Sequence, residues 1–181
     1  ANNNKSLFYS VLGARYIMYG EWMYAKHTVF YDALPDYFME FDIFDREKNI
    51  FLDTPSRKKI TGQIGAIHSV PVLAQGVFKS KEAILGYLGD SNYITEKHID
   101  VLRRLSEKQG LDVERQGRET DPSLTMEGLY IKVETDGEVK MRVKFVRNSF
   151  YQCVNASGSH WQQRPIIPNQ LAVSKKRCED E

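Results

Sequence analysis

The feature that most constrains the fold is an Asp-Gly pair between two runs of alternating residues. The runs at 129–134 and 139–146 flank the turn sequence TDGE at 135–138. Asp-Gly favours a tight turn between antiparallel strands, because both central residues of that turn need a left-handed backbone. Val, Ile, Tyr and Phe in the flanking runs favour strands. The sequence therefore predicts a β-hairpin here and a fold that contains antiparallel sheet.

The second strand of this hairpin carries cations along one face. Side chains two residues apart on a strand point to the same side, so Lys140, Arg142 and Lys144 share a face. Like charges at this spacing repel each other unless carboxylates or a bound anion lie opposite. Two interpretations stay open: a solvated face on which Glu134 pairs with Lys140, or a face that holds phosphate groups.

Two stretches nearer the N-terminus also predict strands. Residues 15–19 and 37–44 are rich in aromatic and apolar side chains, and the whole stretch from 6 to 44 favours strands. Within the run 37–44, Glu40 and Asp42 share a strand face with aromatic rings, and the opposite face carries rings too. An ordinary exposed strand would separate acids from rings more cleanly.

Helices are predicted between these two β-rich regions. Ser80 is a suitable N-cap for a helix over 81–88, which Gly89 would end. A second helix is predicted after Thr95, because apolar residues there recur at helical spacing up to Gly110.

The remaining segments complete a mixed architecture. A short helix or turn is expected from residue 53, a short extended piece at 70–74, and a polar loop at 112–124. Strands, then helices, then strands again predict an α+β domain of antiparallel β-sheets with flanking helices, rather than a doubly wound parallel sheet.

Composition excludes several classes of protein. With 181 residues, 41% hydrophobic and 27% charged, the chain can form one domain with a core, and its apolar runs fall short of the roughly 20 residues that span a membrane. Cys153 and Cys178 form neither a metal spacing nor a disulfide framework, so we expect a cytoplasmic protein. The net charge is only +1, but basic clusters at 57–59, 140–147 and 175–177 offer either solvated faces or contacts to a phosphate-rich partner.

Several common chemistries lack their motifs. The sequence contains no P-loop, no GxGxxG and no GxSxG. The histidines have no ligand spacing, and only His27 and His160 adjoin both aromatic and basic residues. Helix-terminus phosphate binding of the P-loop kind and a local Ser–His triad are therefore not expected.

Four stretches occur in a fixed order: YGEW at 19–22, YFMEFDIF at 37–44, EGLYIK at 127–132 and RVK at 142–144. Together they resemble motifs of the ATP-dependent RNA ligases. This family belongs to the covalent nucleotidyltransferases, with DNA ligases and mRNA capping enzymes. The tail SGSHWQQRPIIPN at 157–169 resembles one subgroup of RNA-ligase-like proteins and would hold substrate contacts.

The resemblance implies an adenylyltransferase domain with the nucleotide between its sheets. It implies ATP, AMP and Mg²⁺ (or Mn²⁺) as cofactors and RNA ends as partners. A lysine would attack the α-phosphate of ATP, the AMP would pass to an RNA 5′-phosphate, and a 3′-hydroxyl would then displace it. We expect residues 1–150 to form the domain core and 151–181 a C-terminal extension of it.

The same resemblance implies roles for individual residues. Which of the basic residues from Lys140 to Arg147 matches each basic position of the last motif stays open. The implied site comprises Glu21 on the ribose, Phe41 stacked on adenine, Glu127 on the catalytic metal, Lys132 in the motif of Glu127, and Arg142 with Lys144 on the α-phosphate.

One family motif is missing. The nucleophilic lysine lies in a KxDG or KxxG sequence upstream of the GE motif, and none occurs in the 20 residues before Glu21. Lys5 does not fit, and Lys26 and Lys132 have the wrong contexts. We expect the N-terminal part of the domain to precede residue 1, and this chain alone not to form lysyl-AMP. The alternatives are a non-catalytic nucleotide- or RNA-binding relative, or a nucleotidyltransferase of the DNA-ligase or capping type.

Overall fold

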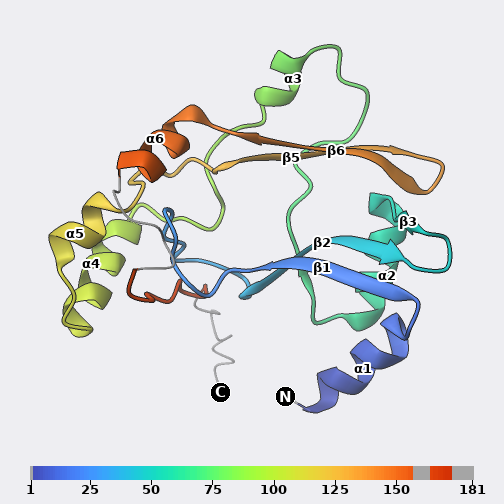
Figure 1. Cartoon of the computed structure of the whole chain (residues 1–181), viewed down its shortest axis with the longest axis horizontal. Coiled ribbons are helices and arrows are strands. Elements are labelled where there is room, and N and C mark those ends of the chain that lie inside the picture. Colours follow the sequence, from blue (N-terminus) through green and yellow to red (C-terminus); the bar gives the residue numbers. More distant parts are fainter. Residues whose placement is uncertain (1, 157–163, 173–181) are drawn as a thin grey trace, which may run out of the picture. The chain divides into compact units, whose positions relative to one another are not determined.

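The computed structural model describes residues 2–156 and 164–172 (Figure 1). His160, the basic cluster at 175–177 and Cys178 lie outside these residues. The described chain forms two compact units that alternate along the sequence, and each is described by itself below. The first unit comprises Ala1–Met23, Phe38–Leu88 and Gly128–Val146, and the second comprises Tyr24–Tyr37, Gly89–Glu127 and Arg147–Glu181.

A small sheet around strand β2 forms the centre of the first unit. Strand β1 (Tyr16–Trp22) pairs antiparallel with β2 (Phe38–Asp45), beside which it lies in Figure 1. Short strands β3 (Ile50–Phe51) and β4 (His68–Ser69) also pair with β2, antiparallel and parallel respectively. The strands expected at 15–19 and 37–44 are thus confirmed.

The prediction of strands from residue 6 onward is wrong for its first part. Helix α1 (Asn2–Leu12) occupies this stretch, and Gly13 ends it with a φ of 52° and an N–H that donates to Tyr9 O at 3.0 Å. The aromatic composition of 6–12 had favoured strand, but Tyr9 is largely exposed rather than packed in a sheet. Gly13 was the signal of a helix end, because glycine adopts the left-handed backbone without a steric penalty.

Helix α2 (Thr54–Ile64) follows β3. Asp53 is its N-cap and accepts a hydrogen bond from Ser56 N at 3.0 Å, and Gly65 ends it in the left-handed region. Further along, Ser80 is the N-cap of α3 (Lys81–Leu85), as predicted, with Ala83 N as its donor. This helix ends three residues early, because the backbone continues as tight turns in which Leu88 N donates to Leu85 O.

The predicted hairpin is confirmed in both strands and turn. Strand β5 (Gly128–Thr135) pairs antiparallel with β6 (Glu138–Val146). Asp136 and Gly137 take φ values of 52° and 83°, as a hairpin turn with two left-handed residues requires. A bulge after Val133 places Glu134 opposite Val139, and Lys140 pairs instead with Glu138, so the expected Glu134–Lys140 pair does not form.

The second unit is mainly helical. It contains α4 (His98–Lys108), α5 (Val113–Arg118) and α6 (Asn148–Ala156). Helix α4 was predicted, whereas α5 lies in the stretch expected as a polar loop; Asp112 begins it by accepting a hydrogen bond from Arg115 N at 3.0 Å. Phe30, Leu102 and Ile167 form a buried cluster, in which α4 packs on a loop and on the C-terminal segment.

The C-terminal segment 164–172 is integrated in the second unit. Its backbone bonds to the loop after β1: Lys26 N donates to Ile167 O at 2.8 Å and Asn169 N donates to Tyr24 O at 2.7 Å. Ile167 and Asn169 are almost completely buried. In the described part of the chain, no helix is long and apolar enough to cross a membrane.

Candidate functional site

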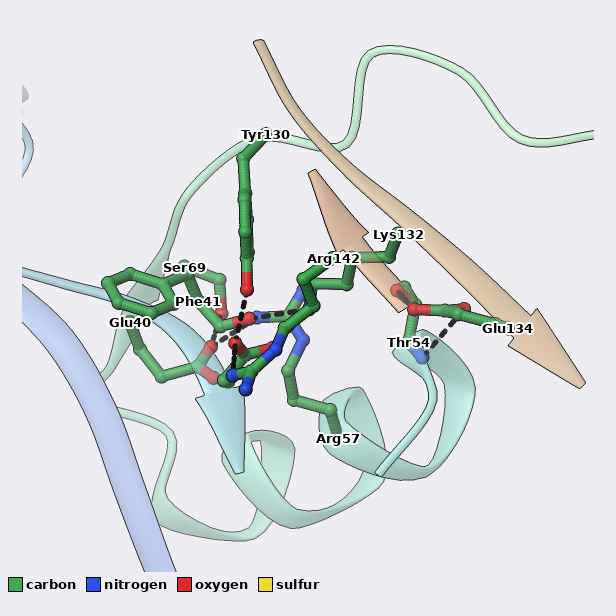
Figure 2. A network of polar contacts seen from close by, with 10 residues as sticks. Glu40, Phe41, Thr54, Arg57, Ser69, Tyr130, Lys132, Glu134 and Arg142 are labelled. Atoms are coloured by element: carbon green, nitrogen blue, oxygen red, sulfur yellow. Dashed lines mark hydrogen bonds and ion pairs between the residues drawn. The ribbon is translucent and has the colours of Figure 1, made fainter. Parts of the chain in front are cut away.

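A buried carboxylate organises the face of the hairpin that carries its cations. Asp42 of β2 is fully buried, and Lys132 Nζ lies 2.6 Å from its Oδ1. Tyr130 Oη donates to Asp42 Oδ2 at 2.7 Å, and Arg142 Nη1 lies 3.3 Å from the same oxygen. Figure 2 shows the side chains of Tyr130, Lys132 and Arg142 within this network of polar contacts. Of the three cations that share a face of β6, Arg142 therefore has a buried carboxylate opposite it, whereas Lys140 pairs with Glu138.

The phenol of Tyr130 stays protonated in this cluster. Burial, followed by the hydrogen bond to Asp42 and the charge of that carboxylate, raises the pKa of Tyr130 to about 12. At neutral pH the hydroxyl therefore remains a donor to Asp42.

Aromatic rings lie beside these charges. The ring of Phe41 meets that of Tyr130 edge to face, with 5.7 Å between centroids, and Lys132 Nζ also donates to Phe41 O at 2.7 Å. The guanidinium of Arg142 lies 3.8 Å from the centroid of the Phe51 ring, a distance typical of a cation–π contact. Aromatic rings and cationic side chains thus occur together in the first unit.

A second ion pair lies two residues away along β2. Glu40 is fully buried, pairs with Arg57 of α2 and accepts a hydrogen bond from Ser69 Oγ at 2.7 Å (Figure 2). Arg57 is buried as well, so it is not part of an exposed basic cluster at 57–59, where only Lys58 and Lys59 are exposed. The buried pair of Glu40 and Arg57 is a structural contact that joins strand β2 to helix α2.

The turn end of the hairpin is attached to helix α2. Glu134 accepts hydrogen bonds from Thr54 N at 3.0 Å and from Thr54 Oγ1 at 2.7 Å. Asp53 N donates to Gly137 O at 3.1 Å. The carboxylate of Glu134 also suits the positive end of the helix dipole. These bonds fix the hairpin against the element that follows β3.

Close packing explains the glycines of the two motifs. A Cβ atom on Gly20 would lie 2.4 Å from the ring of Phe38, and one on Gly128 would lie 1.9 Å from Phe145 O of the paired strand. Neither glycine has a positive φ. Each is required because a ring or a backbone passes where a side chain would start.

Glu127 belongs to the second unit. Its Oε1 accepts a hydrogen bond from Tyr31 Oη at 2.7 Å. Arg147 holds the adjoining backbone, because Arg147 N donates to Glu127 O and Arg147 Nε donates to Met126 O, both at 3.0 Å. Arg147 is itself buried and paired with Asp121, so it is a structural cation and not one of the phosphate contacts considered for 140–147.

The structure brings together three of the expected site residues: Phe41, Lys132 and Arg142. Lys144 is exposed and lies opposite Tyr130 in the hairpin register. Glu21 is also exposed, on β1. Neither of these two side chains forms an ion pair within the residues that the structure describes.

Asp42 and Tyr130 are site residues that the sequence analysis did not assign. The signal for Asp42 was an acid within an aromatic strand, together with cations that could be paired with either carboxylates or a bound anion. The signal for Tyr130 was its spacing of two from Lys132, which places both on one face. The sequence alone could not pair residues 88 positions apart.

Fold and site together define a class. An α+β chain with antiparallel sheets, in which rings and cations lie on β-strands, is compatible with the nucleotidyltransferase type of ligase domain. A family model described as RNA ligase matches residues 2–146, which is most of the chain. The chain therefore belongs to the RNA ligase family. Searches of the curated proteins and of the solved structures found no match.

Proposed function

We propose that the chain carries the adenylyl-handling site of an ATP-dependent RNA ligase acting on broken RNA in the cytoplasm. The observation that supports this most is the cluster around Asp42, in which Lys132 and Arg142 pair with the carboxylate and Tyr130 contacts both Asp42 and the ring of Phe41. Cations that are held in place before substrate binds stabilise charge on a transferring phosphoryl group without further reorganisation. Residues 1–150 would form the core of the adenylyltransferase domain, extended by 151–181.

Each site residue has a role that fits its surroundings. Phe41 would stack on adenine, since its half-buried ring is flat and apolar. Glu21 is exposed on β1 and would accept hydrogen bonds from the ribose. Lys132, Arg142 and Lys144 would bind the phosphate that links AMP to its partner, Lys144 through its exposed ammonium group.

A divalent cation fits a site with one protein carboxylate. Within residues 2–156 and 164–172, no three acidic, histidine or cysteine side chains gather to enclose a metal. Mg²⁺ (or Mn²⁺) usually keeps several waters and binds one or two carboxylates plus substrate phosphates. Glu127 would hold such a cation, directly or through water, and the cation would supply charge neutralisation at the phosphate.

The last step of the reaction can be written with this chain's residues. The oxygen of the RNA 3′-hydroxyl attacks the RNA phosphorus of a 5′-adenylated end and loses its proton. The bond from that phosphorus to the oxygen that bridges it to AMP breaks, and AMP leaves. Lys132, Arg142 and Lys144 would stabilise the phosphate oxygens as charge moves to the leaving AMP.

The first step needs a nucleophile that we do not find here. No KxDG or KxxG sequence precedes Glu21. Lys59 begins the sequence KITG, but this lies downstream, within helix α2, on an exposed turn. We therefore propose that these 181 residues alone do not form lysyl-AMP when incubated with labelled ATP and Mg²⁺.

The test of the function uses an RNA strand that already carries AMP on its 5′-phosphate. Such a donor does not need the lysine nucleophile, so it isolates the sealing step. The chain, with Mg²⁺ and a splinted 3′-hydroxyl acceptor, should release AMP and form a phosphodiester. Binding of ATP without any sealing would instead favour a non-catalytic relative. Faster sealing of DNA than of RNA ends would favour the DNA-ligase type.

A further inference from the structure

Tyr31 donates a hydrogen bond to the carboxylate of Glu127. It lies in the loop between β1 and β2, outside the four family-like stretches, and is half-buried. Its hydroxyl donates to Glu127 Oε1 at 2.7 Å, which is the short distance expected when the acceptor is charged. Glu127 and Tyr31 belong to the same compact unit.

The loop that carries Tyr31 is held by the C-terminal segment. Tyr31 N donates to Asn169 Oδ1 at 2.9 Å, and Gln170 N donates to Tyr31 O at 2.8 Å. Asn169 is 1% exposed, and its own N–H donates to Tyr24 O. The backbone N–H and C=O of Tyr31 are thus both hydrogen-bonded to residues beyond 146, where the family match ends.

The backbone of Glu127 is fixed independently. Arg147 bonds to the carbonyls of Met126 and Glu127, and its guanidinium also pairs with Asp121. The glutamate side chain has three rotatable bonds, and holding such a chain costs up to about 2 kcal/mol of conformational entropy. The hydrogen bond from Tyr31 acts on the carboxylate itself, whereas the bonds from Arg147 act on the backbone.

We propose that Tyr31 is a positioning residue for Glu127, supported by Asn169 from the C-terminal segment. This rests on the proposed function, in which Glu127 holds a divalent cation. The phenol holds the carboxylate of Glu127 through Oε1, in the orientation in which that carboxylate would bind the cation or its water. Partners of metal-binding carboxylates have this effect generally, and their loss lowers metal affinity about 10- to 100-fold.

Tyr37 offers a matched control in the same unit. Its hydroxyl donates to Asn169 O at 3.0 Å, and Tyr37 is half-buried like Tyr31. Tyr31→Phe and Tyr37→Phe therefore remove the same atom from similar surroundings, but only the first removes a bond to Glu127.

The experiment measures Mn²⁺ binding by electron paramagnetic resonance. The chain is mixed with a 5′-adenylated RNA strand without an acceptor, so no turnover occurs. Tyr31→Phe should weaken Mn²⁺ binding about tenfold, Tyr37→Phe should leave it unchanged, and Glu127→Gln should remove it. In the Glu127→Gln background, Tyr31→Phe should add nothing to the loss of sealing.

Three outcomes overturn the inference in distinguishable ways. Normal binding by Tyr31→Phe, with binding lost in Glu127→Gln, removes the role of Tyr31 and leaves the proposed function intact. Equal losses of Mn²⁺ affinity in Tyr31→Phe and Tyr37→Phe would show that the effect is structural and not specific to the bond with Glu127. Normal binding and sealing by Glu127→Gln remove the metal role itself. If Tyr31→Phe does not fold, Asn169→Ala is measured instead, and the same loss of Mn²⁺ affinity is expected.

Discussion

Strand β2 carries two buried carboxylates, and their partners differ. Glu40 pairs with Arg57, whose side chain is 3% exposed, and with the hydroxyl of Ser69. Asp42 pairs with Lys132 and Arg142, whose side chains are 12% and 41% exposed. The first cluster is closed to solvent, whereas the cations of the second can also reach a ligand. The first is a buried ion pair within the fold, and the second is the one for which we propose a role in binding phosphate.

The largest effect is expected at the pair of Glu40 and Arg57. Arg57→Met leaves Glu40 buried without its cation, and breaking a buried pair in this way costs about 3–5 kcal/mol of unfolding free energy. The double variant Glu40→Leu with Arg57→Met should recover most of that loss, because replacing both partners with apolar groups removes the unpaired charge. Denaturant unfolding measures both. A single variant as stable as the wild type would contradict a structural role for this pair.

The second-largest effect, on the sealing rate, is expected for the cluster of Asp42 with Lys132 and Arg142. Asp42→Asn removes the charge that holds Lys132 and Arg142, so sealing of a pre-adenylated RNA strand should fall about 100-fold or more. Single-turnover kinetics measure the sealing rate, and thermal unfolding confirms that the variant folds. If Asp42→Asn lowered stability and left the sealing rate of the folded protein unchanged, Asp42 and Glu40 would both be structural and the distinction would fail.

Lys144 tests whether an exposed cation of the hairpin binds a ligand. Lys144→Ala should slow sealing about tenfold or more, since it removes one charged contact to phosphate. Lys58→Ala is the control, because Lys58 is an exposed lysine of the same unit on helix α2. The account requires the two variants to differ, and equal rates would assign Lys144 to a solvated face.

Tyr130 gives the smallest effect and a pH dependence. Tyr130→Phe removes one of three partners of Asp42, so sealing should fall by about tenfold or less. Because the pKa of Tyr130 is raised to about 12, the phenol contributes stability that is fully present below pH 10 and is lost as the pH rises toward 12. Sealing rates of the wild type and the variant should therefore run parallel from pH 7 to 10. Curves that converge within that range would show that Tyr130 ionises earlier.

Local signals in the sequence predicted much of the fold. The Asp-Gly turn, the alternating runs and the cap Ser80 placed the hairpin, β1, β2 and the start of α3 correctly. The same reasoning gave strand for α1 and loop for α5, because composition there outweighed a single end signal, Gly13 or Asp112. Such short helices depend on packing that the local sequence does not state.

Part of the proposed site could likewise be chosen from local features of the sequence. Lys132, Arg142 and Phe41 could be chosen from their motifs, whereas the repulsion among cations left either carboxylates or a bound anion possible opposite them. Asp42 is the carboxylate that pairs with these cations, whereas Glu40 binds Arg57. Both pairings depend on tertiary contacts, which the spacing of residues along the sequence does not reveal. The hydrogen bond from Tyr31 to Glu127 joins residues 96 positions apart and likewise had no local signal.

The central claim is that the cations around Asp42 act on phosphate during RNA sealing. The most direct measurement is the single-turnover rate at which the chain joins a pre-adenylated RNA strand to a splinted 3′-hydroxyl, for the wild type and for Lys132→Ala. We predict that the wild type forms the phosphodiester and releases AMP, and that Lys132→Ala does so about 100-fold more slowly while it stays folded. Equal rates for the two proteins, or no sealing by the wild type, would contradict the account.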